Sequence, residues 1–129
     1  MEKSKVHLNW NTIEYLVDIL CKKIIVELPF IDSVTGIRRG GLIPAVWISH
    51  KLSLPYVNTI SVNTLVIDDI CDTGKTLQNY PGVYTASLIL RYNSEFIPNI
   101  YAEELKTNEW IQFPWEKQDS DTIQDYLKK

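Results

Sequence analysis

The first regular pattern in the chain is a repeat of apolar residues at helical spacing. Five residues fall on one face of a helix: Ile13, Leu16, Val17, Leu20 and Ile24. Asn11 and Glu14 have the spacing of a capping box, in which two side chains bond backbone N–H groups at the helix start. Pro29 stops the pattern. The sequence therefore predicts a helix from Asn11 to about Leu28.

A short β-prone segment and a second helical segment follow. Ser33 to Ile37 predicts a strand that runs into the loop Arg38-Arg39-Gly40-Gly41. Leu42 to about Leu52 then predicts a helix, with Pro44 in its first turn, where a missing N–H does least harm. A glycine-containing loop thus joins a strand to a helix.

An apolar run in the middle of the chain predicts a strand that is buried on both faces. Thr64-Leu65-Val66-Ile67 consists of β-branched and apolar residues and ends in Asp68-Asp69. Tyr56 to Val62, upstream, predicts a short β-like piece. Downstream, the loop Asp72 to Thr76 is followed by about one helical turn that reaches Tyr80.

The remaining elements complete an alternation of strands and helices. Val83 to Arg91 and Ile100 to Leu105 predict two further strands, and the tail holds Trp110 to Trp115 and an amphipathic helix from about Asp121. Such alternation is typical of an α/β fold with a mostly parallel central sheet flanked by helices. The length of 129 residues fits one domain covering residues 1–129.

Composition narrows the classes of partner and location. The chain is 45% hydrophobic and 22% charged, as in an ordinary globular protein. A formal net charge of -3 and a pI near 5.3 argue against a general nucleic-acid binder. Two cysteines are too few for a disulfide framework. The start has no apolar signal region and no run reaches the length of a membrane span, so a cytoplasmic location is expected.

The strongest chemical signal lies between Leu65 and Thr76. A buried strand delivers two adjacent carboxylates to its carboxyl end, where open α/β sheets bind ligands. The following turn offers backbone N–H groups, two Thr hydroxyls and a Lys at a helix start, which together suit a phosphate. The carboxylates suit ribose hydroxyls or a hard cation that keeps most of its waters.

Two other interpretations of this segment are weaker. Gly74-Lys75-Thr76 has the ending of a Walker A loop, but that motif needs a glycine five residues before Gly74, where the chain has Asp69. A solvated acidic turn is the ordinary alternative. Three aspartates within five residues, directly after an apolar run, would be unusual for such a turn.

The segment resembles the motif by which type I phosphoribosyltransferases bind phosphoribosyl pyrophosphate (PRPP). That motif has apolar residues, two acidic residues, two variable residues and then Asp-Thr-Gly-x-Thr, and every diagnostic position is filled here. The resemblance implies that Asp68 and Asp69 address the ribose hydroxyls, directly or through water bound to Mg²⁺. It also implies that the 5-phosphate is wrapped by five consecutive residues: Asp72, Thr73, Gly74, Lys75 and Thr76.

A second segment, Gly36 to Ala45, resembles the pyrophosphate loop of xanthine-guanine and related purine phosphoribosyltransferases. Those enzymes usually carry Ser-Arg-Gly-Gly where this chain has Arg38-Arg39-Gly40-Gly41. Glycines let the backbone approach a diphosphate, and a guanidinium can bind it in bidentate fashion. The resemblance implies PRPP contacts from Arg38, Arg39 and Gly40 and a cis peptide between the two arginines. A plain turn with two surface arginines is the alternative.

A third segment, which includes Trp110 to Glu116, resembles the small C-terminal base-binding hood of the same subgroup. The resemblance implies that Trp110 stacks on a purine and that the backbone of Ile111 reads its edge. Core packing is the usual fate of tryptophan and is the alternative. Arg91 stands where relatives place a Lys that donates to the 6-oxo group, and its alternative role is that of a surface residue at a strand end.

These resemblances imply an activity, a cofactor and partners. The implied reaction transfers the phosphoribosyl group from PRPP to hypoxanthine, guanine or xanthine, with Mg²⁺ held by Asp68 and Asp69. Asp72 is then the catalytic proton acceptor at the purine imidazole ring, and the chain is expected to form a homodimer or a higher homo-oligomer. A transferase for adenine or a pyrimidine is disfavoured by the segment from Trp110 to Trp115.

The chain departs from the family in one respect, which is the length of the flexible loop. In relatives a long loop precedes the PRPP strand and closes over the site, whereas only Tyr56 to Asn63 follows Pro55 here. Either another segment or a neighbouring subunit covers the site, or catalysis is slow. A regulatory module that binds PRPP with little or no turnover is therefore the alternative function.

Overall fold

The computed structural model describes residues 4–117. Its helices are α1 (Trp10–Glu27), α2 (Leu42–Leu52) and the short 3-10 helix η1 (Leu77–Asn79). Its strands are β1 (Lys5–His7), β2 (Ser33–Gly36), β3 (Thr64–Cys71), β4 (Tyr84–Arg91), β5 (Ile100–Leu105) and β6 (Trp110–Gln112).

The central sheet has the strand order β2-β3-β4-β5, and all of its neighbouring strands are parallel. Its register places Val34 beside Leu65, and Leu65 beside Tyr84. The carboxyl ends of the strands therefore meet at one edge of the sheet. The predicted α/β fold with a mostly parallel sheet is confirmed.

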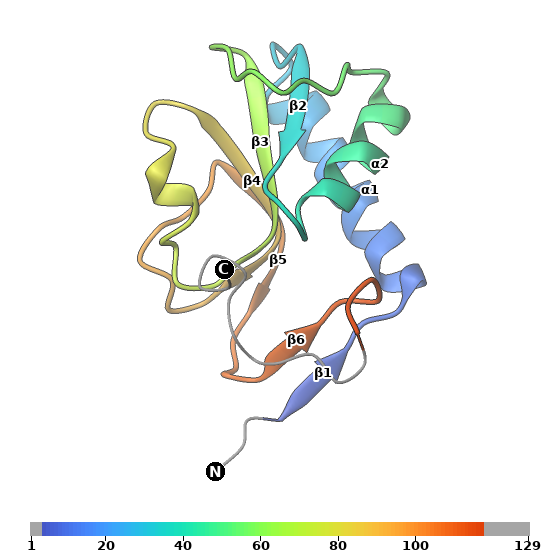
Figure 1. Ribbon diagram of the computed structural model, residues 1–129, viewed down its shortest axis with the longest axis vertical. Coiled ribbons are helices and arrows are strands. Elements are labelled where there is room, and N and C mark those ends of the chain that lie inside the picture. The colour runs from blue at the N-terminus through green and yellow to red at the C-terminus, as the bar shows by residue number, and fades with distance from the viewer. Residues whose placement is uncertain (1–3, 118–129) are drawn as a thin grey trace.

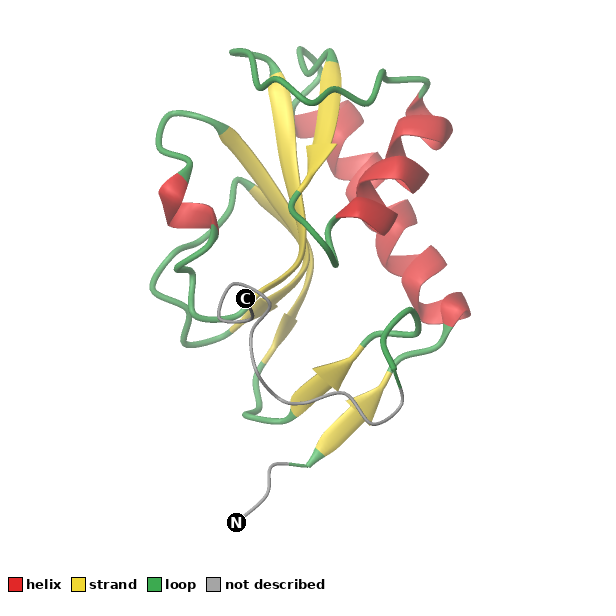
Figure 2. Ribbon diagram, in the orientation of Figure 1, coloured by secondary structure: helices red, strands yellow, loops and turns green. Residues whose placement is uncertain are grey.

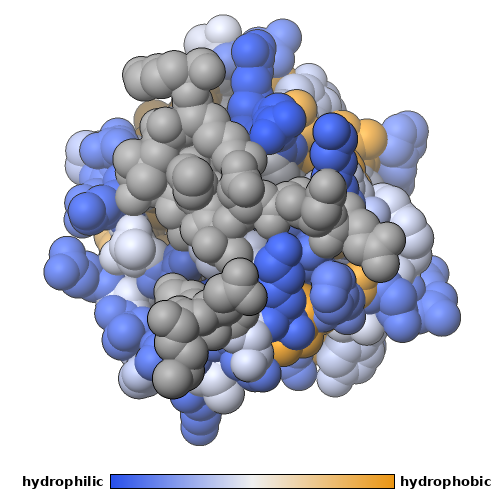
Figure 3. All heavy atoms as spheres, turned by 60° about the horizontal axis from the view of Figure 1, so that its bottom comes forward, coloured by the Kyte–Doolittle hydropathy of each residue, from blue (hydrophilic) through white to orange (hydrophobic). Residues whose placement is uncertain are grey.

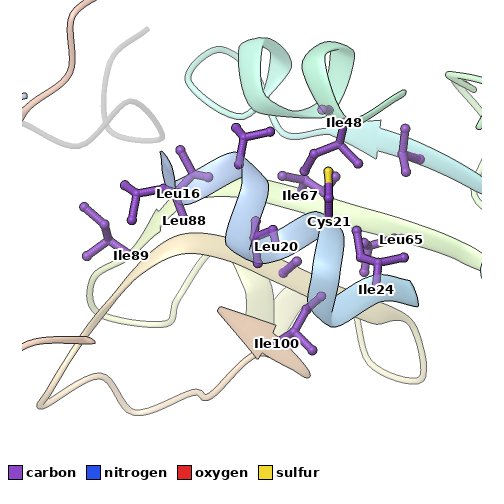
Figure 4. Close-up of a cluster of buried hydrophobic side chains, with 14 of the residues drawn as sticks. Leu16, Leu20, Cys21, Ile24, Ile48, Leu65, Ile67, Leu88, Ile89 and Ile100 are labelled. Carbon is purple, nitrogen blue, oxygen red and sulfur yellow. The ribbon is translucent and has the colours of Figure 1, made fainter. Parts of the chain in front are cut away.

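Helices α1 and α2 pack on one face of this sheet, and η1 lies on the other face (Figures 1 and 2). The apolar stripe of α1 points at the sheet, where Leu20 and Ile24 meet side chains of β3 and β5 (Figure 4). A second, smaller cluster on the far face contains Val66 and Leu77. Strand β3 is thus buried from both sides, as its uninterrupted apolar run predicts.

A two-stranded sheet of β1 and β6 brings the N-terminal segment beside the C-terminal one (Figure 1). The backbone N–H of Trp110 donates to the carbonyl of Ser4 over 2.8 Å, and that of Leu8 donates to Gln112 over 2.9 Å. Nothing in the sequence predicts β1. A three-residue strand that pairs with a segment over a hundred residues away has no local periodicity to reveal it.

Three local predictions need correction. The N-cap of α1 is Asn9, whose side chain accepts from the N–H of Thr12 at 2.9 Å, so Asn11 is already helical. The stretch Tyr56 to Val62 is a loop with a single β-bridge, between Tyr56 and Val34. Strand β3 continues past Asp68 and Asp69 to Cys71 rather than ending at these two residues. The helix expected from about Asp121 lies outside the described residues.

The connection from α2 to β3 is held against β2. Val57 donates its N–H to the carbonyl of Val34 at 2.9 Å, and Asp32 donates to the carbonyl of Asn63 at 3.1 Å. This connection runs along the end of the sheet opposite the carboxyl ends of its strands (top of Figure 1). Among residues 4–117, no helix combines the length and the apolar character that crossing a membrane requires.

The observed cap gives a stability test with a built-in control. We expect Asn9→Ala to lower the free energy of unfolding by about 0.5–2 kcal/mol, because an N–H at the start of α1 loses its acceptor. Asn11→Ala, at an exposed helical position two residues away, is expected to change it by less than about 0.5 kcal/mol. Chemical denaturation measures both, and a larger loss from Asn11→Ala would contradict the assignment.

Candidate functional site

A cavity of about 140 Å³ opens at the carboxyl ends of β3 and β4. Its wall combines residues from four parts of the chain: Ile37, Arg38, Gly40, Asp68, Asp69, Ile70, Cys71, Asp72, Thr73, Gly74, Thr76, Leu77, Arg91, Trp110, Ile111, Phe113 and Glu116. Seen from the end where β1 and β6 lie, the described surface is mostly hydrophilic, with small hydrophobic patches (Figure 3). Three sequence segments that were predicted to act together therefore do line one cavity.

Two adjacent carboxylates form the floor of the site at the end of β3. Asp68 is 9% exposed and accepts from the N–H of Asp69 at 2.8 Å, and Asp69 accepts from the N–H of Ile70 at 2.8 Å. A Cβ atom added at Gly40 would lie 1.9 Å from a carboxylate oxygen of Asp69. A larger residue at position 40 would therefore have to displace the carboxylate of Asp69.

The protein environment disfavours the ionised form of Asp69. Burial raises the pKa of this carboxyl well above its usual range, and the negative charge of Asp68 raises it further. The bond from Ile70 acts in the opposite direction but is outweighed. Two carboxylates held side by side in this way make a site whose charge is relieved by a proton or by a cation.

The segment Asp72 to Thr76 is an irregular loop. Gly74 has φ of +90°, a conformation that other residues rarely adopt, and a Cβ there would lie 2.6 Å from the backbone nitrogen of Phe96. Thr73 accepts from the N–H of Glu95 at 3.1 Å, which ties the loop to the β4–β5 connection. Thr73, Gly74 and Thr76 line the cavity, whereas Lys75 is exposed and lies outside its wall.

The loop between β2 and α2 forms the opposite wall. The peptide bond between Arg38 and Arg39 is cis, as the resemblance predicts. Ile37 donates its N–H to the carbonyl of Ile67 at 2.9 Å, which fixes the start of this loop beside β3. Arg38 and Gly40 line the cavity, and Arg39 is not among its lining residues.

Arg91 lies at the end of β4 and is 4% exposed. Its Nε donates to Oδ1 of Asp72 at 2.9 Å, and its Nη1 donates to the carbonyl oxygens of Thr107 at 2.8 Å and Glu109 at 2.6 Å. The alternative of a solvated arginine at a strand end is therefore wrong. The guanidinium connects the loop after β3 with the turn before β6.

The C-terminal wall contains residues that the sequence analysis assigned no role. Trp110 and Ile111 lie in the wall as predicted, and Phe113 and Glu116 join them. A carboxylate oxygen of Glu116 accepts from the N–H of Phe113 at 2.8 Å. Glu116 directly follows Trp115 in the sequence, and no sequence pattern indicates that it enters the cavity wall.

The carboxylates fit a hard divalent cation. Asp68 and Asp69 offer oxygen ligands, which Mg²⁺ prefers, and a cation beside them would offset the repulsion by which Asp68 raises the pKa of Asp69. Residues 4–117 hold no group of three or more His, Cys, Asp or Glu side chains arranged for a metal. This geometry suits an ion that keeps most of its waters and takes other ligands from a bound phosphate.

The raised pKa of Asp69 predicts a pH-dependent gain in stability from Asp69→Asn. Ionisation of this group costs folding stability. The cost is absent below the ordinary carboxyl pKa, grows as the pH rises from that value to the raised folded-state pKa, and is constant above it. Asn still offers an oxygen to the N–H of Ile70. We expect the variant to be more stable at pH 8 by about 1 kcal/mol, or roughly 2–6 °C in Tm, and equal to the parent near pH 4.

Thermal melting at the two pH values measures this difference. Asp32→Asn replaces an exposed aspartate and is the matched control, with an expected change within about 0.5 kcal/mol at either pH. A gain that does not depend on pH, or a loss of stability at pH 8, would show that Asp69 is not the strained carboxyl.

Comparisons with known proteins agree with this site. No family model matches the chain. A xanthine-guanine phosphoribosyltransferase from Cereibacter sphaeroides is 30% identical over 114 residues, which are 65% of this chain and 68% of that protein. A second one, from Chromohalobacter salexigens, is 26% identical over 134 residues, covering 84% of this chain and 82% of the relative.

A solved structure supports the same assignment. The purine phosphoribosyltransferase from Pyrococcus horikoshii aligns with a TM-score of 0.75 and 27% identity, covering 88% of this chain and 95% of that one. Sequence relatives, fold and cavity thus agree. The chain belongs to the purine subgroup of the type I phosphoribosyltransferases and is a purine phosphoribosyltransferase.

Proposed function

We propose that this enzyme transfers the 5-phosphoribosyl group of PRPP to a 6-oxopurine, giving a nucleoside 5'-monophosphate and pyrophosphate. The observation that carries the proposal is the position of Asp72. Asp72 lines the cavity and starts the loop proposed to bind the sugar phosphate, and its carboxylate accepts from Arg91, which also bonds the turn before β6, the strand proposed to bind the base. A proton acceptor at this place adjoins both substrates at once.

The sugar phosphate is proposed to bind at the loop Asp72 to Thr76. Thr73, Gly74 and Thr76 supply hydroxyl and backbone N–H groups from the cavity wall, which suit the 5-phosphate. Asp68 and Asp69 then face the ribose hydroxyls. Lys75, which is exposed, stays a predicted contact that contributes mainly through its charge.

The pyrophosphate is proposed to lie against the loop that joins β2 and α2. Arg38 and Gly40 line the cavity, and a guanidinium can bind a diphosphate in bidentate fashion. We propose that Arg38 makes the main contact with the pyrophosphate, and a contact from Arg39 remains a prediction. Asp68 and Asp69 would hold Mg²⁺, which neutralises charge on the departing diphosphate when it is bound.

The purine is proposed to bind between Trp110, Ile111 and Arg91. Trp110 offers a ring for stacking, and Ile111 offers backbone groups for the edge of the base. Nη2 of Arg91 bonds to none of the described residues and remains as a donor for a 6-oxo group. A 6-amino group is itself a donor, so this arrangement favours hypoxanthine, guanine or xanthine over adenine.

The chemical step then follows from the placement of these groups. A purine ring nitrogen attacks C1 of the ribose, the bond from C1 to the pyrophosphate oxygen breaks, and pyrophosphate leaves with the electron pair. Asp72 accepts the proton that the imidazole ring releases. General-base help of this kind contributes on the order of a hundredfold to ten-thousandfold to the rate.

The proposal predicts that Asp72→Asn removes turnover while PRPP binding persists. We expect kcat to fall by roughly a hundredfold to ten-thousandfold, because an amide cannot accept the proton. Asp32→Asn is the matched control and is expected to keep the parent rate. Chromatography of the nucleotide formed from PRPP, Mg²⁺ and each of hypoxanthine, guanine, xanthine and adenine measures the effect.

The same assay separates the alternative functions. Nucleotide formed by the parent enzyme from a 6-oxopurine, and lost in Asp72→Asn, supports the proposal. Binding of PRPP without any nucleotide would favour a regulatory module, for which the short connection between α2 and β3 is the structural argument. Preference for adenine would overturn the proposed role of Arg91 at the base.

A further inference from the structure

Arg91 makes more contacts with the protein than recognition of a base requires. Three of its five N–H donors are used within the chain, by one carboxylate oxygen and two backbone carbonyls. The side chain of Arg91 is 5% exposed and that of Asp72 is 20% exposed, so their ion pair is only weakly screened by solvent. A fixed guanidinium of this kind constrains the segments that it joins.

The acceptors belong to two different parts of the site. Asp72 starts the loop proposed to bind the sugar phosphate. Thr107 and Glu109 form the turn that leads directly into Trp110, the first residue of β6. Within this turn the hydroxyl of Thr107 donates to Glu109 at 3.0 Å. The backbone carbonyls of both residues accept from Arg91, which joins the turn to the central sheet.

We infer that Arg91 is a positioning residue that sets the distance and orientation between Asp72 and the base-binding strand β6. The inference rests on the proposed function, in which Asp72 takes a proton from a base held by Trp110. Nε donates to Oδ1 of Asp72 and thereby orients its carboxylate. Nη1 holds the turn before Trp110, so the proton acceptor and the stacking ring are oriented by one rigid group.

An arginine suits this role better than a lysine would. The guanidinium is planar and presents Nε and Nη1 in a fixed fork, which reaches a carboxylate on one side and two carbonyls on the other. An ammonium group is a point charge on a flexible stem and directs all its donors from one atom. Charge alone therefore does not reproduce the constraint.

The test uses a purine that lacks a 6-oxo group. Arg91→Met is assayed with hypoxanthine and with unsubstituted purine, alongside Arg91→Lys. Lys51→Met is the control, because it removes an ion pair, with Asp18 at 2.7 Å, that lies away from the cavity. Hydrogen exchange across residues 106–112 is followed in the same proteins, and Tm confirms that each variant is folded.

The positioning role predicts losses with both bases. We expect Arg91→Met to lower kcat/KM on the order of a hundredfold for hypoxanthine and also for unsubstituted purine, since misplacing the reacting groups affects any base. Exchange across residues 106–112 should accelerate, and Arg91→Lys should restore neither the purine rate nor the slow exchange.

Two results would overturn the inference. One is a loss confined to hypoxanthine with unchanged hydrogen exchange, which would leave Arg91 only a direct contact to the 6-oxo group. The other is full recovery by Arg91→Lys. If the parent enzyme makes no nucleotide from any base, the proposed function is wrong instead. Hydrogen exchange of residues 106–112 in the parent and in Arg91→Met would still decide whether Arg91 holds the turn.

Discussion

Two carboxylates placed side by side in a partly buried position are the constraint around which the site is arranged. Asp68 and Asp69 are adjacent in one strand, and the surrounding protein raises the pKa of Asp69 because both burial and the neighbouring charge oppose its ionisation. Such an arrangement is unfavourable in the empty protein. In the proposed function, a cation that binds together with a polyhydroxyl or phosphate ligand relieves this cost.

The fold explains how this unfavourable pair is held in place. Strand β3 is bonded to β2 on one side and to β4 on the other, and apolar side chains cover both of its faces. The packing and hydrogen bonds of this buried strand offset the free-energy cost of holding Asp68 and Asp69 side by side at its end. The glycine at position 40 then lets the neighbouring loop approach the carboxylates. Arg91, at the end of β4, bonds both the loop after β3 and the turn before β6 and so fixes them to the sheet.

The parts of the structure that the sequence predicted are those with strong local signals. Each of these signals specifies one helix, strand or loop: the stripe from Ile13 to Ile24, the apolar run before Asp68 and the motif ending in Thr76. The missed features depend on distant partners. The pairing of β1 with β6, the three bonds of Arg91 and the entry of Glu116 into the cavity wall all join segments that no local pattern relates. The spacing of Asn11 and Glu14 predicts a capping box, whereas the cap geometry that makes Asn9 the N-cap is not visible in the sequence.

The account depends on one anion site in which the loop Asp72 to Thr76, the two aspartates and a divalent ion act as a unit. Calorimetric titration of the protein with PRPP, in the presence of Mg²⁺ and again in EDTA, tests this most directly. The account predicts saturable one-site binding with Mg²⁺ that weakens by at least about tenfold (roughly 1.4 kcal/mol) without it. Equal affinity under both conditions, or no binding of PRPP at all, would contradict it.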